Sequence, residues 1–239
     1  PENTCDCSYE CRFDFDVETF ASFMRAVHDC MTMHHNPYHN FFHICDVTQG
    51  VFVLLTKIHA AKYLTHLETL GLVVAALCHD LEHPGFNNAY LINTCHPLAM
   101  LYNDQSVLEN HHASRAFQLL FNEPQNNFLA SIWDRNRSQF RRLRKVIIQT
   151  ILATDMTYHF KLQEELKGVV MRAQTAVAAE RERRGGGRGR AESMDGDGGA
   201  VMPKRLVGMK HESMSEADRE ILMKALLHCA DISNPVRPW

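Results

Sequence analysis

The sequence HDLEH at positions 79–83 places two imidazoles and two carboxylates within five residues. An apolar run at 71–78 precedes this motif, and a Pro-Gly pair at 84–85 follows it. Because positions i and i+4 of a helix share one face, we expect His79 and His83 to point the same way at a helix C-terminus. Imidazole and carboxylate groups bind first-row divalent metals well. The motif therefore predicts a metal site, and a hydrogen-bonded surface cluster is the alternative explanation.

Two further segments supply groups of the same chemical kind. The sequence YHNFFH puts His39 and His43 four residues apart at the predicted start of a helix. Asp231 ends an apolar helical pattern, where a charge is costly unless it is paired or bound to a cation. Asp231 would then join His43 and the first two residues of the HDLEH motif. Together they would form a mixed nitrogen and oxygen site supplied by three helices.

Helical periodicity dominates the elements that must position these groups, and no segment alternates clearly in the manner of a strand. We therefore expect an all-α fold, a compact bundle of antiparallel and crossing helices. The predicted helices cover 16–33, 40–59, 67–83, 111–122, 126–134, 138–155, 158–183 and 215–231. Short helical pieces and loops are expected between 84 and 110, where Asn and Pro are frequent.

The composition is ordinary for a soluble domain with a sizeable core. The chain has 239 residues, of which 45% are hydrophobic and 22% charged. Its formal net charge of -3 gives no general attraction to nucleic acid or to anionic lipid. No apolar run reaches the roughly 18 residues of a membrane span. We therefore expect a cytoplasmic domain. Whether it belongs to a larger, membrane-associated protein is an alternative that the sequence leaves open.

Two segments depart from the helical pattern. Residues 1–12 are polar and irregular, and they contain Cys5, Cys7 and Cys11 in a spacing that matches no standard zinc motif. Residues 185–200 are rich in Gly and Arg, which predicts a flexible surface insert. We therefore expect one domain over 13–239 that carries this insert.

Seven blocks of the sequence resemble class I 3′,5′-cyclic nucleotide phosphodiesterases, which are HD-superfamily metallohydrolases. The blocks are YHNFFH at 38–43, HDLEHPGFNN at 79–88, LINT at 91–94, YND at 102–104, SVLENHH at 106–112, ILATDM at 151–156 and ADISNP at 230–235. They follow the family's order, and the resemblance covers positions 13–239. It implies the all-α catalytic domain of that family. Because the chain stops soon after ADISNP, we expect that domain to be incomplete at its C-terminal end.

The resemblance implies a role for each residue that matches a family motif. The implied ligands of the tighter metal, usually zinc, are His43, His79, Asp80 and Asp231. Asp80 would also bridge to a second metal, usually magnesium or manganese, that waters otherwise hold. The residues implied to orient these waters are His83, Glu109 and Thr154. His39 is the implied general acid, which Glu109 would keep in its donating form. The implied lining of the nucleotide pocket is Tyr38, Asn88, Met156, Ile232 and Asn234.

These residue types suit the hydrolysis of a cyclic phosphodiester. A hydroxide that bridges two cations is a nucleophile at neutral pH, and the cations polarise the phosphoryl oxygens. In-line attack opens the ring, and an imidazolium gives the leaving O3′ its proton. The expected function is hydrolysis of cAMP, cGMP or both to 5′-monophosphates in cyclic nucleotide signalling. Regulatory domains outside this chain are the expected protein partners.

The sequence also departs from the family pattern. Glu82 stands where the family more often has Asp, and Phe52 stands where many members have His. The purine-selective Gln and the clamp Phe of the family are absent, so the resemblance does not choose between cAMP and cGMP. One alternative is another HD-type phosphohydrolase acting on nucleotide monoesters or triphosphates, which the blocks YHN and ADISNP disfavour. A second is an inactive truncated form with a binding or regulatory role. Every metal-ligand and acid position is filled, which favours the enzyme.

Overall fold

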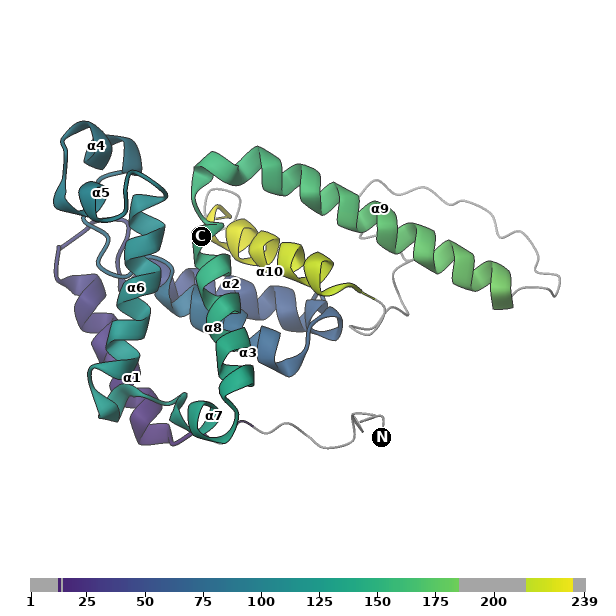
Figure 1. Cartoon of the computed structure of the whole chain (residues 1–239), viewed down its shortest axis with the longest axis horizontal. Coiled ribbons are helices and arrows are strands. Elements are labelled where there is room, and N and C mark those ends of the chain that lie inside the picture. Colours follow the sequence, from purple (N-terminus) through teal and green to yellow (C-terminus); the bar gives the residue numbers. More distant parts are fainter. Residues whose placement is uncertain (1–12, 14, 185–213, 234–239) are drawn as a thin grey trace.

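The computed structural model describes residues 13, 15–184 and 214–233. Within these ranges the backbone forms ten α-helices, three short 3-10 turns and loops, with no strand (Figure 1). The predicted all-α fold is confirmed. None of the described helices is both long enough and apolar enough to span a membrane. The segment 1–12, the predicted insert at 185–200 and the pocket candidate Asn234 lie outside the described residues.

Six helices of 13 to 16 residues make up the bundle: α1 (Val17–Thr32), α2 (Phe41–Thr56), α3 (His66–Cys78), α6 (Val107–Phe121), α8 (Arg137–Leu152) and α10 (Glu216–Asp231). The short helices are α4 (Asn88–Asn93), α5 (Pro97–Leu101) and α7 (Ala130–Arg135). The long helix α9 (His159–Arg184) runs along α10 (Figure 1). The 3-10 turns are η1 (Ala60–Tyr63), η2 (Pro124–Asn126) and η3 (Met156–Tyr158).

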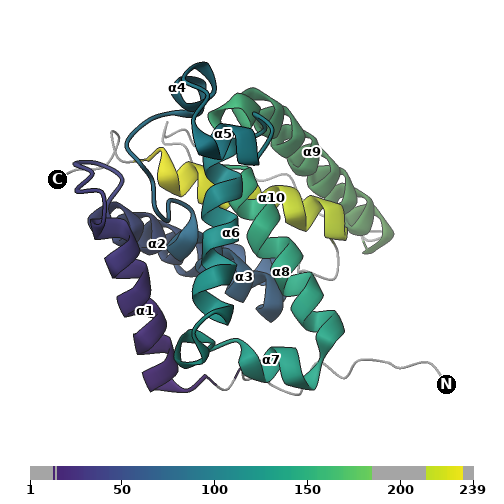
Figure 2. The same ribbon diagram turned by 60° about the vertical axis from the view of Figure 1, so that its left-hand side comes forward.

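Helix α3 lies at the centre of the core because its sequence is apolar almost all round. It begins with a capping box, in which the Thr65 hydroxyl accepts from the Glu68 N–H and the Glu68 carboxylate accepts from the Thr65 N–H. It packs against α2, α6 and α8, and Figure 2 places α6 and α8 side by side over it. A Cβ at Gly71 would lie 2.5 Å from Val146 Cγ1, so glycine permits the close approach of α3 to α8.

The HDLEH motif lies beyond the end of α3 and not on it, so the predicted shared helical face of its two histidines was wrong. Helix α3 ends at Cys78, positions 79–82 form turns, and His83 follows in irregular backbone. Glu82 has a φ of 59°, which a right-handed helix cannot accommodate. Leu81 is completely buried, so the turn is drawn into the core. Gly85, at φ 86°, then turns the chain away from the motif.

Other boundaries differ by a few residues. Helix α6 begins at Val107, four residues before its predicted start, and α8 ends at Leu152, three residues before its predicted end. The predicted helix 126–134 is divided between η2 and α7. These differences place Glu109 in the first turn of α6 and Thr154 in the loop after α8.

Candidate metal centre

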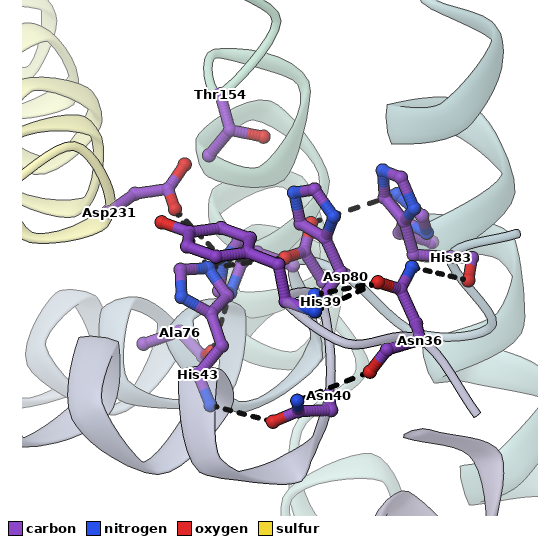
Figure 3. A network of polar contacts seen from close by, with 12 residues as sticks. Asn36, His39, Asn40, His43, Ala76, Asp80, His83, Thr154 and Asp231 are labelled. Carbon is purple, nitrogen blue, oxygen red and sulfur yellow. Dashed lines mark hydrogen bonds and ion pairs between the residues drawn. The ribbon is translucent and has the colours of Figure 1, made fainter. Parts of the chain in front are cut away.

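Four side chains of types that can bind a metal come from three elements and meet at one place (Figure 3). His43 lies in the first turn of α2, behind the cap formed by Asn40. His79 is the C-cap of α3 and Asp80 follows it, so the end of that central helix fixes both. Asp231 is the last residue of α10. Both imidazoles and Asp80 are buried, and Asp231 is half-buried.

The ligand atoms have the spacing of a tetrahedral metal site. His43 Nε2 lies 3.0 Å from Asp231 Oδ1, 3.3 Å from Asp80 Oδ2 and 3.4 Å from His79 Nε2. His79 Nε2 lies 3.4 Å from Asp80 Oδ2 and 3.5 Å from Asp231 Oδ1. A tetrahedral ion with bonds of about 2.0–2.1 Å separates its ligand atoms by about 3.4 Å. These five edges therefore fit a divalent transition metal.

Charge and hydrogen bonding favour the same conclusion. His79 Nδ1 lies 2.9 Å from the Ala76 carbonyl, so Nδ1–H donates there, and in the neutral ring Nε2 presents its lone pair to the cluster. Burial alone would lower the pKa of His79, but the carboxylates of Asp80 and Asp231 raise it to about 9. Burial opposes ionisation of these two carboxyls, yet the neighbouring imidazoles hold both pKa values well below the usual range. The cluster therefore requires positive charge, which a proton or a divalent cation supplies.

A second set of ligand atoms shares Asp80 with the first. Atoms of Asp80, His83 and His112 lie within 4.8 Å of one another, and His112 Nε2 is 3.9 Å from Asp80 Oδ1. Because Asp80 turns Oδ2 toward the first set and Oδ1 toward the second, its carboxylate is placed to bridge two cations. Among the described residues, the buried Oδ2 atom has no hydrogen-bond donor.

The two histidines of the second set have different tautomers. Burial lowers the pKa of His83 to about 4 and that of His112 to about 3, so both rings are neutral at pH 7. His83 Nδ1 accepts the Gly85 N–H at 3.0 Å, which leaves the proton on Nε2. His112 Nδ1 donates to the Leu81 carbonyl at 2.6 Å, which leaves a lone pair on Nε2. His83 can therefore donate to a water, whereas His112 can accept from one or bind a cation.

His112 is the residue of this centre that sequence reasoning missed. It is the last residue of the block SVLENHH, but neither its residue type nor the family resemblance implied a role for it. The available indication was its position three residues after Glu109, which places both on one face of α6. Both residues are buried on that face.

His39 lies in the turn before α2 and is half-buried. Its ring stacks on the ring of His83, with centroids 3.8 Å apart and an angle of 12° between the planes. Burial lowers the pKa of His39, and the nearby carboxylate of Asp80 opposes this shift only in part.

Glu109 faces Asn88 across the start of α4. Its Oε2 accepts from Asn88 Nδ2 at 2.9 Å, and burial raises its pKa to about 7. Asn88 Oδ1 accepts the Leu108 N–H at 2.9 Å, so the Asn88 amide joins the starts of α4 and α6. The orientation of His39 by Glu109 stays a prediction.

The remaining candidates that the structure describes are Thr154, Tyr38, Met156 and Ile232. Thr154 is half-buried, and its hydroxyl donates to the Ile151 carbonyl at 2.7 Å, which leaves the oxygen lone pairs for another donor. Figure 3 shows Thr154 on the same side of the centre as Asp231. Tyr38, Met156 and Ile232 are large side chains with 50%, 59% and 42% of their surface exposed. These exposed faces are available to an apolar ligand.

Comparison with known proteins identifies one family. A family model described as 3′5′-cyclic nucleotide phosphodiesterase matches residues 38–239. The 3′,5′-cyclic-nucleotide phosphodiesterase regA of Dictyostelium discoideum is 34% identical over 95% of this chain and 24% of its own length. The dual specificity calcium/calmodulin-dependent 3′,5′-cyclic nucleotide phosphodiesterase 1C of Mus musculus is 33% identical over 95% of this chain and 26% of its own.

Solved structures agree with this result. The phosphodiesterase domain of the RhoPDE fusion protein from the choanoflagellate Salpingoeca rosetta matches with a TM-score of 0.68 and 32% identity. The match covers 95% of this chain and 58% of that domain. The chain thus spans about a quarter of the length of the curated relatives named above and a little over half of the solved domain.

Proposed function

The chain belongs to the 3′,5′-cyclic nucleotide phosphodiesterase family, and on that premise we propose that its metal centre hydrolyses a 3′,5′-cyclic nucleotide to the 5′-monophosphate. The substrate we propose is cAMP, cGMP or both. The observation that carries the proposal is the tetrahedral spacing of the four ligand atoms, with a second set that shares Asp80. We also propose that the full-length protein has regulatory domains outside this chain, because the chain matches only about a quarter of the length of these relatives.

The family implies divalent metal cofactors, and the His and Asp clusters of this chain have the donor atoms to bind them. We propose zinc for the first set, because two imidazoles and two carboxylates at tetrahedral spacing suit that ion. We propose magnesium or manganese for the second set, where His83 and Glu109 are placed to hold waters around the ion. When bound, the two cations would supply a nucleophile at neutral pH and positive charge for the phosphoryl oxygens.

His39 is the proton donor in this proposal. A water oxygen bonds to phosphorus as the P–O3′ bond breaks, a ring N–H of His39 gives its proton to O3′, and the proton that the water loses passes to solvent. A lowered pKa makes the imidazolium of His39 a stronger acid but a less populated one at pH 7. The anionic phosphate of the substrate would raise that pKa again, so substrate binding and protonation of His39 favour each other.

The other residues hold water and nucleotide. We propose that Thr154 accepts a hydrogen bond from an ordered water through its free lone pairs. Asn88 positions Glu109 through the bond described above, and direct contact of Asn88 with the nucleotide remains a prediction from the resemblance. The proposed walls of the pocket for the base and ribose are Tyr38, Met156, Ile232 and Asn234.

The test is turnover by the full-length protein that contains this chain, with Zn²⁺ and Mg²⁺ present. We expect cAMP, cGMP or both to yield 5′-monophosphates, measured by chromatography, and nucleoside monophosphates and triphosphates to remain intact. The variant Asp231→Asn should lose both the tight ion and the turnover. Hydrolysis of monoesters or triphosphates alone would indicate a different HD-type phosphohydrolase. Full metal occupancy without any turnover would contradict the proposed function.

A further inference from the structure

Asn36 is a buried polar residue that lies outside the sequence blocks shared with the family. Only 9% of its surface is exposed. It precedes the turn that carries His39, and Figure 3 shows its side chain between that turn and the segment of His83. A buried amide is costly unless its donors and acceptors are satisfied, so its partners indicate what it does.

The amide oxygen of Asn36 fixes the turn that carries the proposed acid. Its Oδ1 accepts the N–H groups of Tyr38 and His39, each at 3.1 Å. The Asn36 carbonyl accepts from Asn40 Nδ2 at 3.2 Å. Asn40 Oδ1 in turn accepts the N–H groups of Phe42 and His43 and caps α2. The backbone from Asn36 to the start of α2 is therefore held by side-chain amides at both of its ends.

The amide nitrogen of Asn36 reaches the metal-binding motif. Its Nδ2 donates to the His83 carbonyl at 3.5 Å. A Cβ placed at Gly85 would lie 3.4 Å from the same nitrogen, so Asn36 packs directly against the turn that follows the motif. One side chain thus joins the two backbone segments whose rings, His39 and His83, stack on each other.

We propose that Asn36 is a positioning residue that holds the imidazole of His39 above the metal-binding turn, where it meets the leaving oxygen. The inference rests on the proposed function, in which His39 donates the proton. A misplacement of about 1 Å is enough to cost roughly a hundredfold in rate. Asn is suited to the position because it accepts two N–H groups and donates to a carbonyl with one side chain.

The test compares variants on two substrates that differ in their need for a proton. Asn36→Leu keeps the approximate volume and removes both polar functions. We expect it to lower kcat for the cyclic nucleotide roughly tenfold to a hundredfold. KM, metal content and turnover of a 4-nitrophenyl phosphodiester, whose leaving group needs no proton, should stay within about twofold. Asn36→Asp keeps the acceptor but loses the donor to His83, so it should show a smaller loss with the same substrate selectivity.

Asn136 provides the matched control. Its Oδ1 accepts the N–H groups of Ser138 and Gln139, each at 3.0 Å, in the same local geometry at the start of α8. Asn136→Leu should lower the melting temperature and leave the ratio of the two turnover rates unchanged. A variant that only weakens the fold would behave in this way at either position.

Two results would overturn the inference. One is equal loss on both substrates, or no loss, in Asn36→Leu. If that variant does not fold, wild-type rates on both substrates in Asn36→Asp would overturn it instead. The variant His39→Ala separates this inference from the proposed function. A leaving-group-selective loss in His39→Ala without one at Asn36 rejects only the role of Asn36, whereas no selective loss in His39→Ala rejects the acid itself.

Discussion

His39 and His43 lie four residues apart but have different surroundings. His43 points its Nε2 at three other ligand atoms, whereas the ring of His39 lies on the ring of His83. We therefore expect His43→Ala to lose the tightly bound ion. His39→Ala should keep both ions and lower turnover of the cyclic nucleotide by about a hundredfold or more, the usual scale for a lost general acid. Elemental analysis beside steady-state kinetics measures both effects, and loss of metal in His39→Ala would rule out the acid role.

The candidate site could be predicted from residue types only in part. The four proposed ligands of the first set are polar residues at the ends of apolar helical patterns. A polar residue in such a position is conspicuous in the sequence alone. Asn36 and His112 do not stand out in this way. Their proposed roles depend on which backbone groups face them in the fold. The tautomers of His83 and His112 likewise depend on the single backbone group that faces each Nδ1.

At the scale of elements, the central helix α3 shows why the ends of helices are hard to predict. Its apolar run and its start with Thr65 and Glu68 follow from the sequence. Its end does not, because burial of Leu81 and the left-handed backbone of Glu82 are imposed by packing against the rest of the core. The consequence is functional: a continued helix would put His79 and His83 on one face, whereas the turn assigns them to two neighbouring clusters.

Glu68 ties the start of α3 to α8 and α10. Its carboxylate accepts from Arg142 at 3.2 Å and from Arg219 at 3.0 Å. Burial alone would raise its pKa, but the Thr65 N–H and the Arg219 guanidinium lower it below the usual value of 4.5. Glu68→Gln should therefore lower the free energy of unfolding at pH 7 by roughly 2–4 kcal/mol.

The effect of Glu68→Gln should depend on pH in a definite direction. A lowered pKa in the folded state contributes stability that is present above the unfolded pKa and is lost as the pH falls through the folded pKa. The difference between wild type and variant should thus shrink below about pH 4.5. Denaturant titrations at several pH values measure it. Glu164→Gln, in an exposed pair with Lys167, should change stability by less than about 1 kcal/mol, and an equal effect of the two variants would contradict the assignment.

Gly71 tests the contact between α3 and α8. Alanine there would place its Cβ 2.5 Å from Val146 Cγ1, so the overpacking should outweigh the better helix propensity of alanine. We expect Gly71→Ala to lower the free energy of unfolding by about 1–3 kcal/mol in chemical denaturation. At Gly168 on α9 the nearest atom, 3.1 Å away, belongs to the exposed guanidinium at the end of the long Arg172 side chain, which is paired with Asp218. Gly168→Ala should be neutral or stabilising, and a larger loss there than at Gly71 would contradict the argument.

At the scale of the whole molecule, the Gly- and Arg-rich sequence at 185–200 separates α9 from α10 along the chain. Its few apolar side chains predict that it gives the core little burial to offset ordering entropy. Deleting it should leave the melting temperature and the metal content nearly unchanged. Calorimetry and elemental analysis of the deletion variant decide the matter, since a large fall in either would show that the segment packs on the domain.

The central claim is that three helices assemble one tight metal site from nitrogen and oxygen ligands alone. X-ray absorption at the edge of the bound metal in the purified protein tests this claim most directly. We predict about one tightly bound ion per chain with four nitrogen or oxygen neighbours at about 2.0–2.1 Å and the scattering pattern of imidazole. The chain also has eight cysteines, so an ion held elsewhere would show sulfur near about 2.3 Å. Sulfur in the first shell, or no tightly bound ion in protein that accepts none when metal is added, would contradict the account.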